Sequence, residues 1–403
     1  MEEIIKKKIK DNTLRTVIVL SGHTAALGIV RSLGMLGVPV VLIHYGDHDF
    51  AGRSRFVSVN LRAPHPEISE EEFINFLLDC SIRFPGAVLF PATDESLVAV
   101  ARHEELLKQH FLIAGNNWNV TRSFIEKQIT YSLAEKCGVP VPRTLIPRSV
   151  EEARSCGNEI GFPCLVKPCQ GHLYTEHFGN KMVRVDTIAQ LEEAYINSRQ
   201  FSLDVMLQEF IPGDDNCVVN YNSYAREGEV LVEFTAVHIR NGPPLTGSPR
   251  VVISRKVPEV IEPGRRMVRG LGFNGFSCIE FKLDTRDSLY KVLDVNGRHN
   301  LSTLLAVRCG INFPWLHYNH ISEGITPHAT AFQEEIYWID LFRDIGYTWK
   351  YLMTEPVSFM DYIRPYLRPH IFAIFDRNDI WPFLRRLVSY KGRRKCCSLN
   401  KPV

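Results

Sequence analysis

The chain has 403 residues, which corresponds to two or three domains at about 150 residues each. Hydrophobic residues make up 45% and charged residues 23%, proportions that exclude a disordered or collagen-like chain. Lys and Arg number 47 against 45 Asp and Glu, which leaves a formal charge of +2. This balance gives no basic domain or stripe, so we expect no nucleic-acid partner.

The N-terminus and the cysteines favour a cytoplasmic protein. The charged start, MEEIIKKKIK, is not followed by the apolar stretch of a secretory signal. No run of about 18 apolar residues predicts a membrane span. The ten cysteines are scattered and include no C-x-x-C pair, which favours reduced thiols over disulfides or a zinc site.

The first part of the chain has the pattern of an α/β domain. The expected strands are residues 16–20, 38–43, 87–90 and 111–114, with a helix over 25–36. We predict that residues 13–120 form an open, mostly parallel sheet. The turn after the first strand lacks G-x-G-x-x-G, which argues against a dinucleotide. The polar turns Ser21–Thr24 and Thr93–Glu95 are interpreted either as small-molecule contacts at strand ends or as helix caps.

A lysine closes an apolar strand in the middle of the chain. A helix is expected over 122–137, and the following GVPVP ends it because proline cannot continue a helix. Lys167 then stands at the end of the strand CLVK, in otherwise apolar surroundings. A charge in such a place is costly unless it meets an anion, and the alternative is a lysine exposed at the strand end.

A predicted hairpin brings oxygen ligands together. Residues 276–283 and 289–295 read as its two strands. Strand alternation places Asp294 and Asn296 on one face, with Glu280 across the hairpin from them. Two carboxylates and an amide oxygen form a site suited to Mg²⁺, with Arg298 beside it.

Several ordered segments resemble the ATP-grasp superfamily, in particular its carboxylate–amine ligases. They are TAALGIVRSLG, EKQ leading to GVPVPRT, GFPCLVKP, QEFIPG, GFNGFSCIEFK and LDVNGRHN, and the resemblance spans about residues 16–320. The last segment resembles the superfamily's E-x-N-x-R strand, with Asp294 in place of the common Glu and Gly297 in place of the common Pro.

The resemblance implies a role for each matching residue. Implied nucleotide-binding residues are the phosphate-contacting Lys127, Lys167 on the α-phosphate side, the adenine hinge Glu209, Phe210 and Ile211, and Asp214 or Asp215 for the ribose. Glu280, Asp294 and Asn296 are the implied ligands of Mg²⁺, or of Mn²⁺, and Arg298 is the implied catalytic arginine beside the transferred phosphate. Residues 170–180 correspond to the phosphate lid. ATP is the implied nucleotide.

The resemblance also implies the fold class. We expect an α/β protein with an N-terminal open parallel-sheet (pre-ATP-grasp) domain over 13–120. A two-lobed α+β ATP-grasp domain follows over 121–325, with its lid lobe at about 150–210. Residues 326–403 form an expected helical extension that is rich in aromatic residues and has a basic tail.

Two surface regions are open to more than one interpretation. Arg240 and Arg250 flank a turn-rich loop that either binds a substrate carboxylate or phosphate or is simply solvated. The aromatic extension either packs on the body or contacts a membrane surface or lipid-linked substrate through its aromatic and basic residues. The second alternative would place a cytoplasmic protein at the membrane periphery.

The function expected from the sequence is an ATP-dependent ligase that joins a small carboxylate to an amine through an acyl phosphate, releasing ADP and phosphate. No Ser, Cys or His nucleophile motif competes with this interpretation. The alternatives are a carboxylase or carbamoyl-phosphate-type enzyme, and a nucleotide-binding scaffold without catalysis. A homo-oligomer is compatible with each of them.

Overall fold

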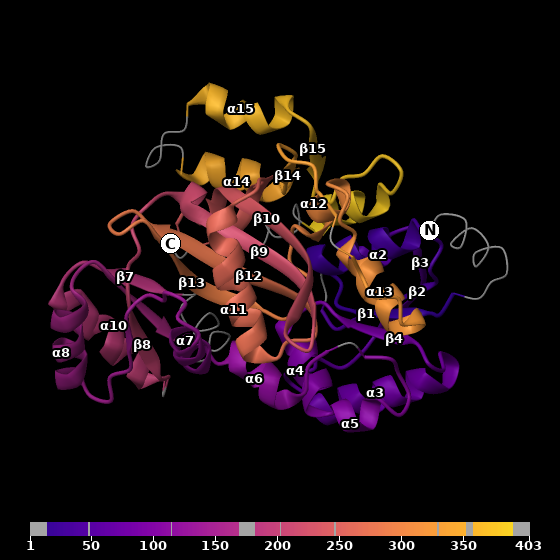
Figure 1. The fold of residues 1–403 in the computed structure, drawn as a ribbon, viewed down its shortest axis with the longest axis horizontal. Coiled ribbons are helices and arrows are strands. Elements are labelled where there is room, and N and C mark those ends of the chain that lie inside the picture. Colours follow the sequence, from indigo (N-terminus) through magenta and orange to yellow (C-terminus); the bar gives the residue numbers. More distant parts are fainter. Residues whose placement is uncertain are drawn as a thin grey trace, which may run out of the picture.

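The computed structural model describes residues 14–46, 49–113, 115–168, 182–201, 203–245, 247–328, 330–351 and 358–389. Within these residues the strands form three sheets. Figure 1 shows the N-terminal sheet at the right, a long sheet at the centre, and a small sheet at the left. The predicted lid, residues 170–180, and the basic residues 391–395 lie outside the described residues.

The N-terminal sheet is parallel, as predicted. Its strands, in the order β3-β2-β1-β4, are β1 (Val17–Leu20), β2 (Val40–His44), β3 (Val57–Arg62) and β4 (Val88–Pro91). The helices of this unit are α2 (Thr24–Gly34), α3 (Glu70–Arg83), α4 (Asp94–Arg102) and α5 (Glu104–Leu107). The predicted strand at 111–114 contributes only an isolated bridge between Leu112 and Val88.

The small sheet has the order β5-β8-β6-β7 and is antiparallel. Its strands are β5 (Thr144–Leu145), β6 (Cys164–Pro168), β7 (Val183–Val185) and β8 (Val205–Glu209), and α8 (Val150–Ile160) packs with α10 (Ile188–Gln200) beside them. The helix predicted over 122–137 is two helices, α6 (Trp118–Ile125) and α7 (Lys127–Lys136). The chain turns at Glu126, whose ψ of 102° is extended, so Lys127 begins a new helix.

The central sheet has seven strands in the order β13-β12-β9-β10-β11-β14-β15. They are β9 (Val218–Arg226), β10 (Glu229–Gly242), β11 (Ser248–Ser254), β12 (Gly275–Asp284), β13 (Leu289–Asn296), β14 (Tyr337–Ile339) and β15 (His370–Phe372). Alternation divides β12 between two environments. Ile279 and Phe281 are fully buried in the core cluster that includes Met267 and Val268 of α11 (Ile261–Leu271), whereas Glu280 points to the opposite side.

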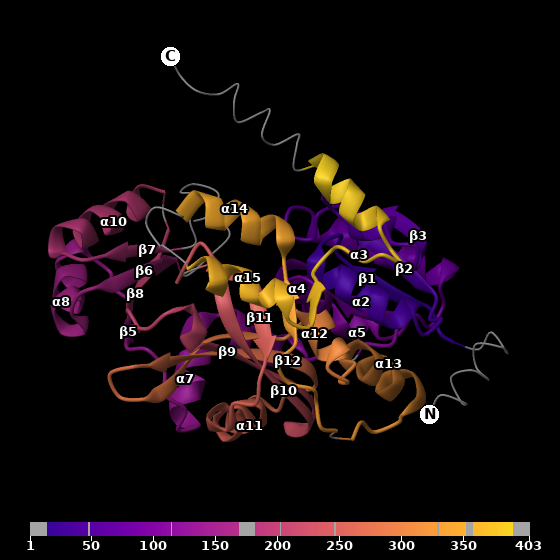
Figure 2. The ribbon, with the colours of Figure 1, turned by 90° about the horizontal axis from the view of Figure 1, so that it is seen from above.

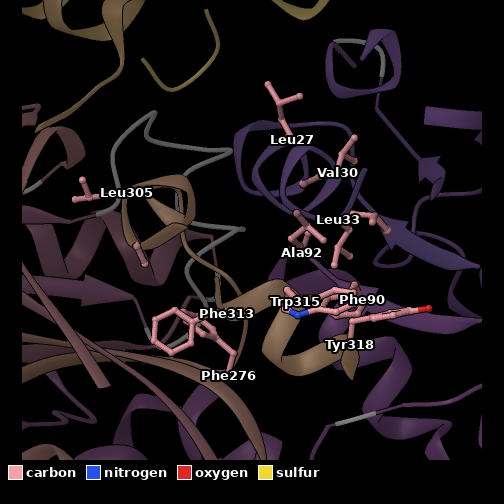
Figure 3. Packing of buried hydrophobic residues seen from close by; sticks show 14 of the residues in the cluster. Leu27, Val30, Leu33, Phe90, Ala92, Phe276, Leu305, Phe313, Trp315 and Tyr318 are labelled. Carbon is pink, nitrogen blue, oxygen red and sulfur yellow. The ribbon is translucent and has the colours of Figure 1, made fainter. Parts of the chain in front are cut away.

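Aromatic side chains join the N-terminal unit to the central sheet. Figure 3 shows Phe90 of β4 beside Trp315 and Tyr318 of α13 (Phe313–Glu323). In the same cluster the rings of Phe276 and Phe313 lie 5.1 Å apart, edge to face. This shared core holds the two units side by side.

The C-terminal segment is helical, as predicted, and it also extends the central sheet. Strands β14 and β15 lengthen the sheet, and Trp338 of β14 is fully buried. Helix α12 (Thr303–Arg308) precedes α13, and α14 (Leu341–Tyr351) and α15 (Phe359–Leu367) follow it. In the views of Figures 1 and 2, α14 and α15 lie above the central sheet.

Two buried ion pairs fasten this segment. In the first, Asp344 of α14 accepts hydrogen bonds from Arg240 at 2.8 and 2.9 Å and from Arg250 at 3.1 Å. In the second, Asp379 accepts one from Arg31 of α2 at 2.9 Å. The segment is thus tied to both the central sheet and the N-terminal unit.

Replacing Asp344 with Ala should destabilise the fold strongly, because two buried guanidinium groups would lose their counterion. We expect a loss of about 3–5 kcal/mol in the free energy of unfolding, measured with urea. Glu335→Ala is the matched control, since Glu335 forms an exposed pair with Arg255 and should lose less than about 1 kcal/mol. Equal losses in the two variants would contradict the anchoring role.

Candidate active site

A cleft of about 1230 Å³ opens where the three sheets meet. Its floor is the exposed face of β12 and β13, one wall is the small sheet, and the other is the start of α4. This volume exceeds the usual range for a single small ligand, about 300–1,000 Å³, and suits a nucleotide together with a second substrate.

The pairing of β12 with β13 sets the floor of the cleft. Glu280 lies directly opposite Asp294, and Cys278 lies opposite Asn296. Residues opposite one another in an antiparallel pair share a face, so both carboxylates and the amide of Asn296 line the cleft. The sequence prediction of this juxtaposition is confirmed in its geometry.

The donor set fits a hard cation whose remaining coordination positions are filled by phosphate oxygens and water. No group of three or more His, Cys, Asp or Glu side chains arranged for a metal occurs among the residues that the structure describes. Two carboxylates and an amide oxygen are nevertheless ligands that Mg²⁺ accepts, with phosphate oxygens and water completing its octahedron. Glu280, Asp294 and Asn296 would hold such an ion.

Helix α7 brings Lys127 to these carboxylates. Its Nζ donates to Oδ1 of Asp294 at 2.8 Å. One turn later, the hydroxyl of Tyr131 donates to the carbonyl of Leu293 at 3.0 Å and ties the helix to β13. Burial alone would lower the pKa of Lys127, but Asp294 and the other nearby groups raise it above its ordinary value. Lys127 is therefore a cation held over the floor of the cleft.

Lys167 approaches from the small sheet. Its side chain is 8% exposed, and its ammonium donates to the amide oxygen of Gln208 on the neighbouring strand. Burial, reinforced by the positive charge of Lys127, lowers the pKa of Lys167 to about 7. An anion entering the cleft would restore the charged form.

Arg298 connects the floor to the N-terminal unit. It donates two parallel hydrogen bonds, both of 2.8 Å, to Asp94 in the first turn of α4. Burial would lower the pKa of Arg298, but this carboxylate raises it above the ordinary value. In the turn Thr93–Glu95, the predicted helix cap is confirmed at Thr93, and Asp94 and Glu95 line the cleft.

Comparisons with known proteins agree with this arrangement. No protein-family model matches the chain. It is 24% identical over 229 residues to the D-aspartate ligase of Enterococcus faecium, and the match covers 53% of each chain. The L-amino acid ligase of Bacillus licheniformis superposes with a TM-score of 0.62 at 19% identity, over 77% of this chain and 74% of that one. The N5-carboxyaminoimidazole synthetase of Staphylococcus aureus complexed with ADP gives 0.62 at 12% identity, over 79% and 80%.

The chain is therefore similar in sequence and in fold to these ligases, as the resemblance to the ATP-grasp superfamily led us to expect. Its match spans about half the length of the curated D-aspartate ligase. The departure from the ATP-grasp strand at Gly297 has a local cause, because a Cβ there would collide with the ring of Phe124.

The expected adenine hinge lines the cleft, but its acidic side chain is occupied. Glu209 accepts hydrogen bonds from the backbone N–H of Arg143 and from the side chains of Arg286 and Lys291. Burial would raise the pKa of Glu209, and these donors together hold it below its ordinary value. Any nucleotide contact at this position must therefore come from backbone groups, with Phe210 and Ile211 beside them.

Neither candidate for the ribose acid lines the cleft. Asp214 is exposed, and Asp215 accepts hydrogen bonds from the backbone of Asn241 and Leu245 at 2.7 and 2.8 Å. Asp215 therefore shapes the turn after β10, and Asn241 and Leu245 in turn line the cleft.

The loop arginines proposed as substrate contacts have another role. Arg240 and Arg250 are 5% and 4% exposed, respectively, and neither lines the cleft. Both side chains are committed to Asp344, so they dock the C-terminal segment instead of a substrate.

Sequence reasoning missed Lys282, which lines the cleft two residues after Glu280. The signal was present, because alternation places residues 280 and 282 on one face of the strand.

Among the described helices, none is both long enough and apolar enough to span a bilayer.

The lowered pKa of Lys167 predicts proton uptake when a nucleotide binds. At pH 8 the free lysine is mostly neutral, and a phosphate favours its charged form, so MgADP binding should take up about one proton. Affinity should then fall roughly tenfold per pH unit above pH 7. Calorimetry in buffers of different ionisation enthalpy measures the uptake. Lys167→Met should abolish the uptake, and undiminished uptake in this variant would contradict the assignment.

Proposed function

We propose that this protein is an ATP-dependent ligase that joins a carboxylate to an amine and releases ADP and phosphate. The observation that carries the proposal is the convergence of Lys127 and Lys167 with the opposed Glu280 and Asp294 in one cleft. The names of the D-aspartate and L-amino acid ligases support carbon–nitrogen bond formation. The proposal specifies the two substrates only by chemical class, as a carboxylate and an amine.

The chemistry requires activation of a poor acyl donor. A carboxylate oxygen attacks the γ-phosphorus of ATP, an oxygen–phosphorus bond forms, and ADP leaves. The amine then attacks the acyl carbon, phosphate leaves with the electron pair of the carbon–oxygen bond, and the amine loses a proton. Such phosphoryl transfer depends on positioning and charge neutralisation more than on a covalent enzyme nucleophile.

Each residue of the cleft has a place in this scheme. Mg²⁺, or Mn²⁺, would supply charge neutralisation at the transferring phosphoryl group. Lys127 and Lys167 bind and orient the phosphates through their ammonium groups. Arg298, held in orientation by Asp94, presents its guanidinium beside the transferred group. The backbone of residues 209–211 accommodates the adenine.

The same cleft would also serve a carboxylase or carbamoyl-phosphate-type enzyme, and no observation on the described residues favours that alternative over ligation. A scaffold without catalysis is disfavoured by the opposed carboxylates, because nothing in the packing of the hairpin requires two acids at positions 280 and 294. We also propose that the domain boundaries lie at residues 120 and 325.

We further propose that the C-terminal segment contacts an anionic membrane surface. Its helices expose apolar side chains at helical spacing, namely Ile345, Trp349, Phe359, Met360, Leu367, Trp381, Leu384 and Val388. Arg385 and Arg386 adjoin this set, and the sequence continues with four more basic residues at 391–395. Aromatic and basic side chains together suit the lipid interface. The protein would then be cytoplasmic and peripheral to the membrane.

The ligase proposal is tested by product analysis. Incubation of the purified protein with MgATP and pooled carboxylates and amines should release ADP and phosphate. Glu280→Gln and Asp294→Asn should each lower turnover by at least about a hundredfold, because each removes a charged oxygen ligand. Stoichiometric AMP and pyrophosphate would exclude the acyl-phosphate route, and near-normal turnover in either variant would exclude the metal assignment.

Sedimentation with vesicles tests the membrane contact. The protein should bind vesicles containing phosphatidylserine at low salt and detach at about 0.5 M salt, because the basic residues act through a screened potential. Trp349→Ser with Trp381→Ser should weaken binding without changing the oligomeric state. Absence of binding at low salt would exclude the membrane contact, and dissociation of a dimer by the double variant would assign the exposed apolar face to contact between two copies.

A further inference from the structure

Lys282 occupies the same face of β12 as the opposed carboxylates. It follows Glu280 by two residues, which along a strand is about 6.6–6.8 Å, in the direction away from Asn296 and toward the hinge. Its side chain is only 4% exposed, and it lines the cleft. Lys282 therefore lies between the carboxylate floor and Phe210.

Among the residues that the structure describes, carboxylates act on the ammonium of Lys282 only from beyond ion-pair distance, namely those of Asp214, Asp215 and Asp284. No hydrogen bond or ion pair joins this ammonium to another described side chain. It lies instead over the ring of Phe210, whose centroid is 5.4 Å from Nζ. Lys291, its partner across the hairpin, differs completely. Lys291 donates to Asp284 at 2.6 Å and to Glu209 at 3.4 Å.

The acid nearest along the strand is not available to Lys282. Asp284 is fully buried and accepts hydrogen bonds from both Arg286 and Lys291, so its charge is already balanced. A buried ammonium without a partner is unfavourable in the free protein, and the face of an aromatic ring compensates only part of that penalty. The arrangement is explained if an anion that enters the cleft completes it.

We propose that Lys282 is a nucleotide-binding residue whose counterion is the phosphate adjoining the sugar of the bound nucleoside di- or triphosphate. This inference rests on the proposed function. The position follows from the two ends of the site, because the hinge holds the base and the opposed carboxylates hold the metal near the terminal phosphates. Lys282 lies between them, where the sugar joins the phosphate chain. It positions the nucleotide and takes no part in the transfer itself.

The test is the affinity of the full-length protein for MgADP and for adenosine. Lys282→Met keeps the length of the side chain and removes its charge. We expect the Kd of MgADP, measured by calorimetry, to rise at least tenfold, and that of adenosine, measured by competition, to change less than twofold. The melting temperature of the ligand-free variant should be unchanged or higher, because an unpaired buried charge is removed. Lys282→Arg should recover part of the MgADP affinity.

Lys256→Met is the matched control, since Lys256 is an exposed residue paired with Glu334 and should leave both affinities unchanged. If the wild-type protein binds MgADP and Lys282→Met binds it equally well, the inference is wrong while the proposed function stands. If the variant melts lower and loses adenosine affinity to the same extent, Lys282 has a structural role. If the wild-type protein does not bind MgADP, the proposed function itself fails.

Discussion

The antiparallel pairing of β12 with β13 is the constraint on which the site depends. Its register sets Glu280 against Asp294, and the neighbouring pairing with β9 adds Asn220 beside Glu280. A slip of one residue would turn every one of these side chains to the opposite face, into the core beneath α11. The apolar alternation of Ile279 and Phe281 prevents that slip, because these residues need the buried side.

The remaining parts of the cleft are brought to this hairpin by polar contacts from other units. Lys127 reaches Asp294 from α7, and Asp94 reaches Arg298 from the N-terminal unit. Each contact joins residues that are more than 160 positions apart. Asp294 and Arg298 are thus each paired with an opposite charge at the floor, and the buried Lys167 and Lys282 line the same cleft.

The C-terminal segment has a structural function that its composition does not reveal. It extends the central sheet with β14 and β15 and fastens both units through Asp344 and Asp379. Some of its aromatic residues, such as Trp338, are therefore core residues, whereas others, such as Trp349, are exposed. Buried and exposed aromatic residues are therefore both present in this one segment.

The sequence by itself determined the features that depend on local order. Short apolar strands alternating with amphipathic helices predicted the parallel N-terminal sheet, and strand alternation predicted the hairpin that opposes Glu280 and Asp294. The same alternation was sufficient to place Lys282, although the motif drew attention to the acids. These patterns involve only residues that are close together in the chain, so they could be recognised without knowledge of the tertiary structure.

Only the tertiary structure decided the fate of residues whose partners lie far away. Arg240 and Arg250 flank a turn-rich loop and could be taken for substrate-binding arginines. In the structure both donate hydrogen bonds to the buried Asp344, about a hundred positions later. Asp215 stands where a ribose-binding acid is expected, but its carboxylate oxygens accept hydrogen bonds from the backbone N–H groups of residues 241 and 245. A charged side chain takes whichever partner the fold brings within hydrogen-bond distance, and local sequence does not contain that information.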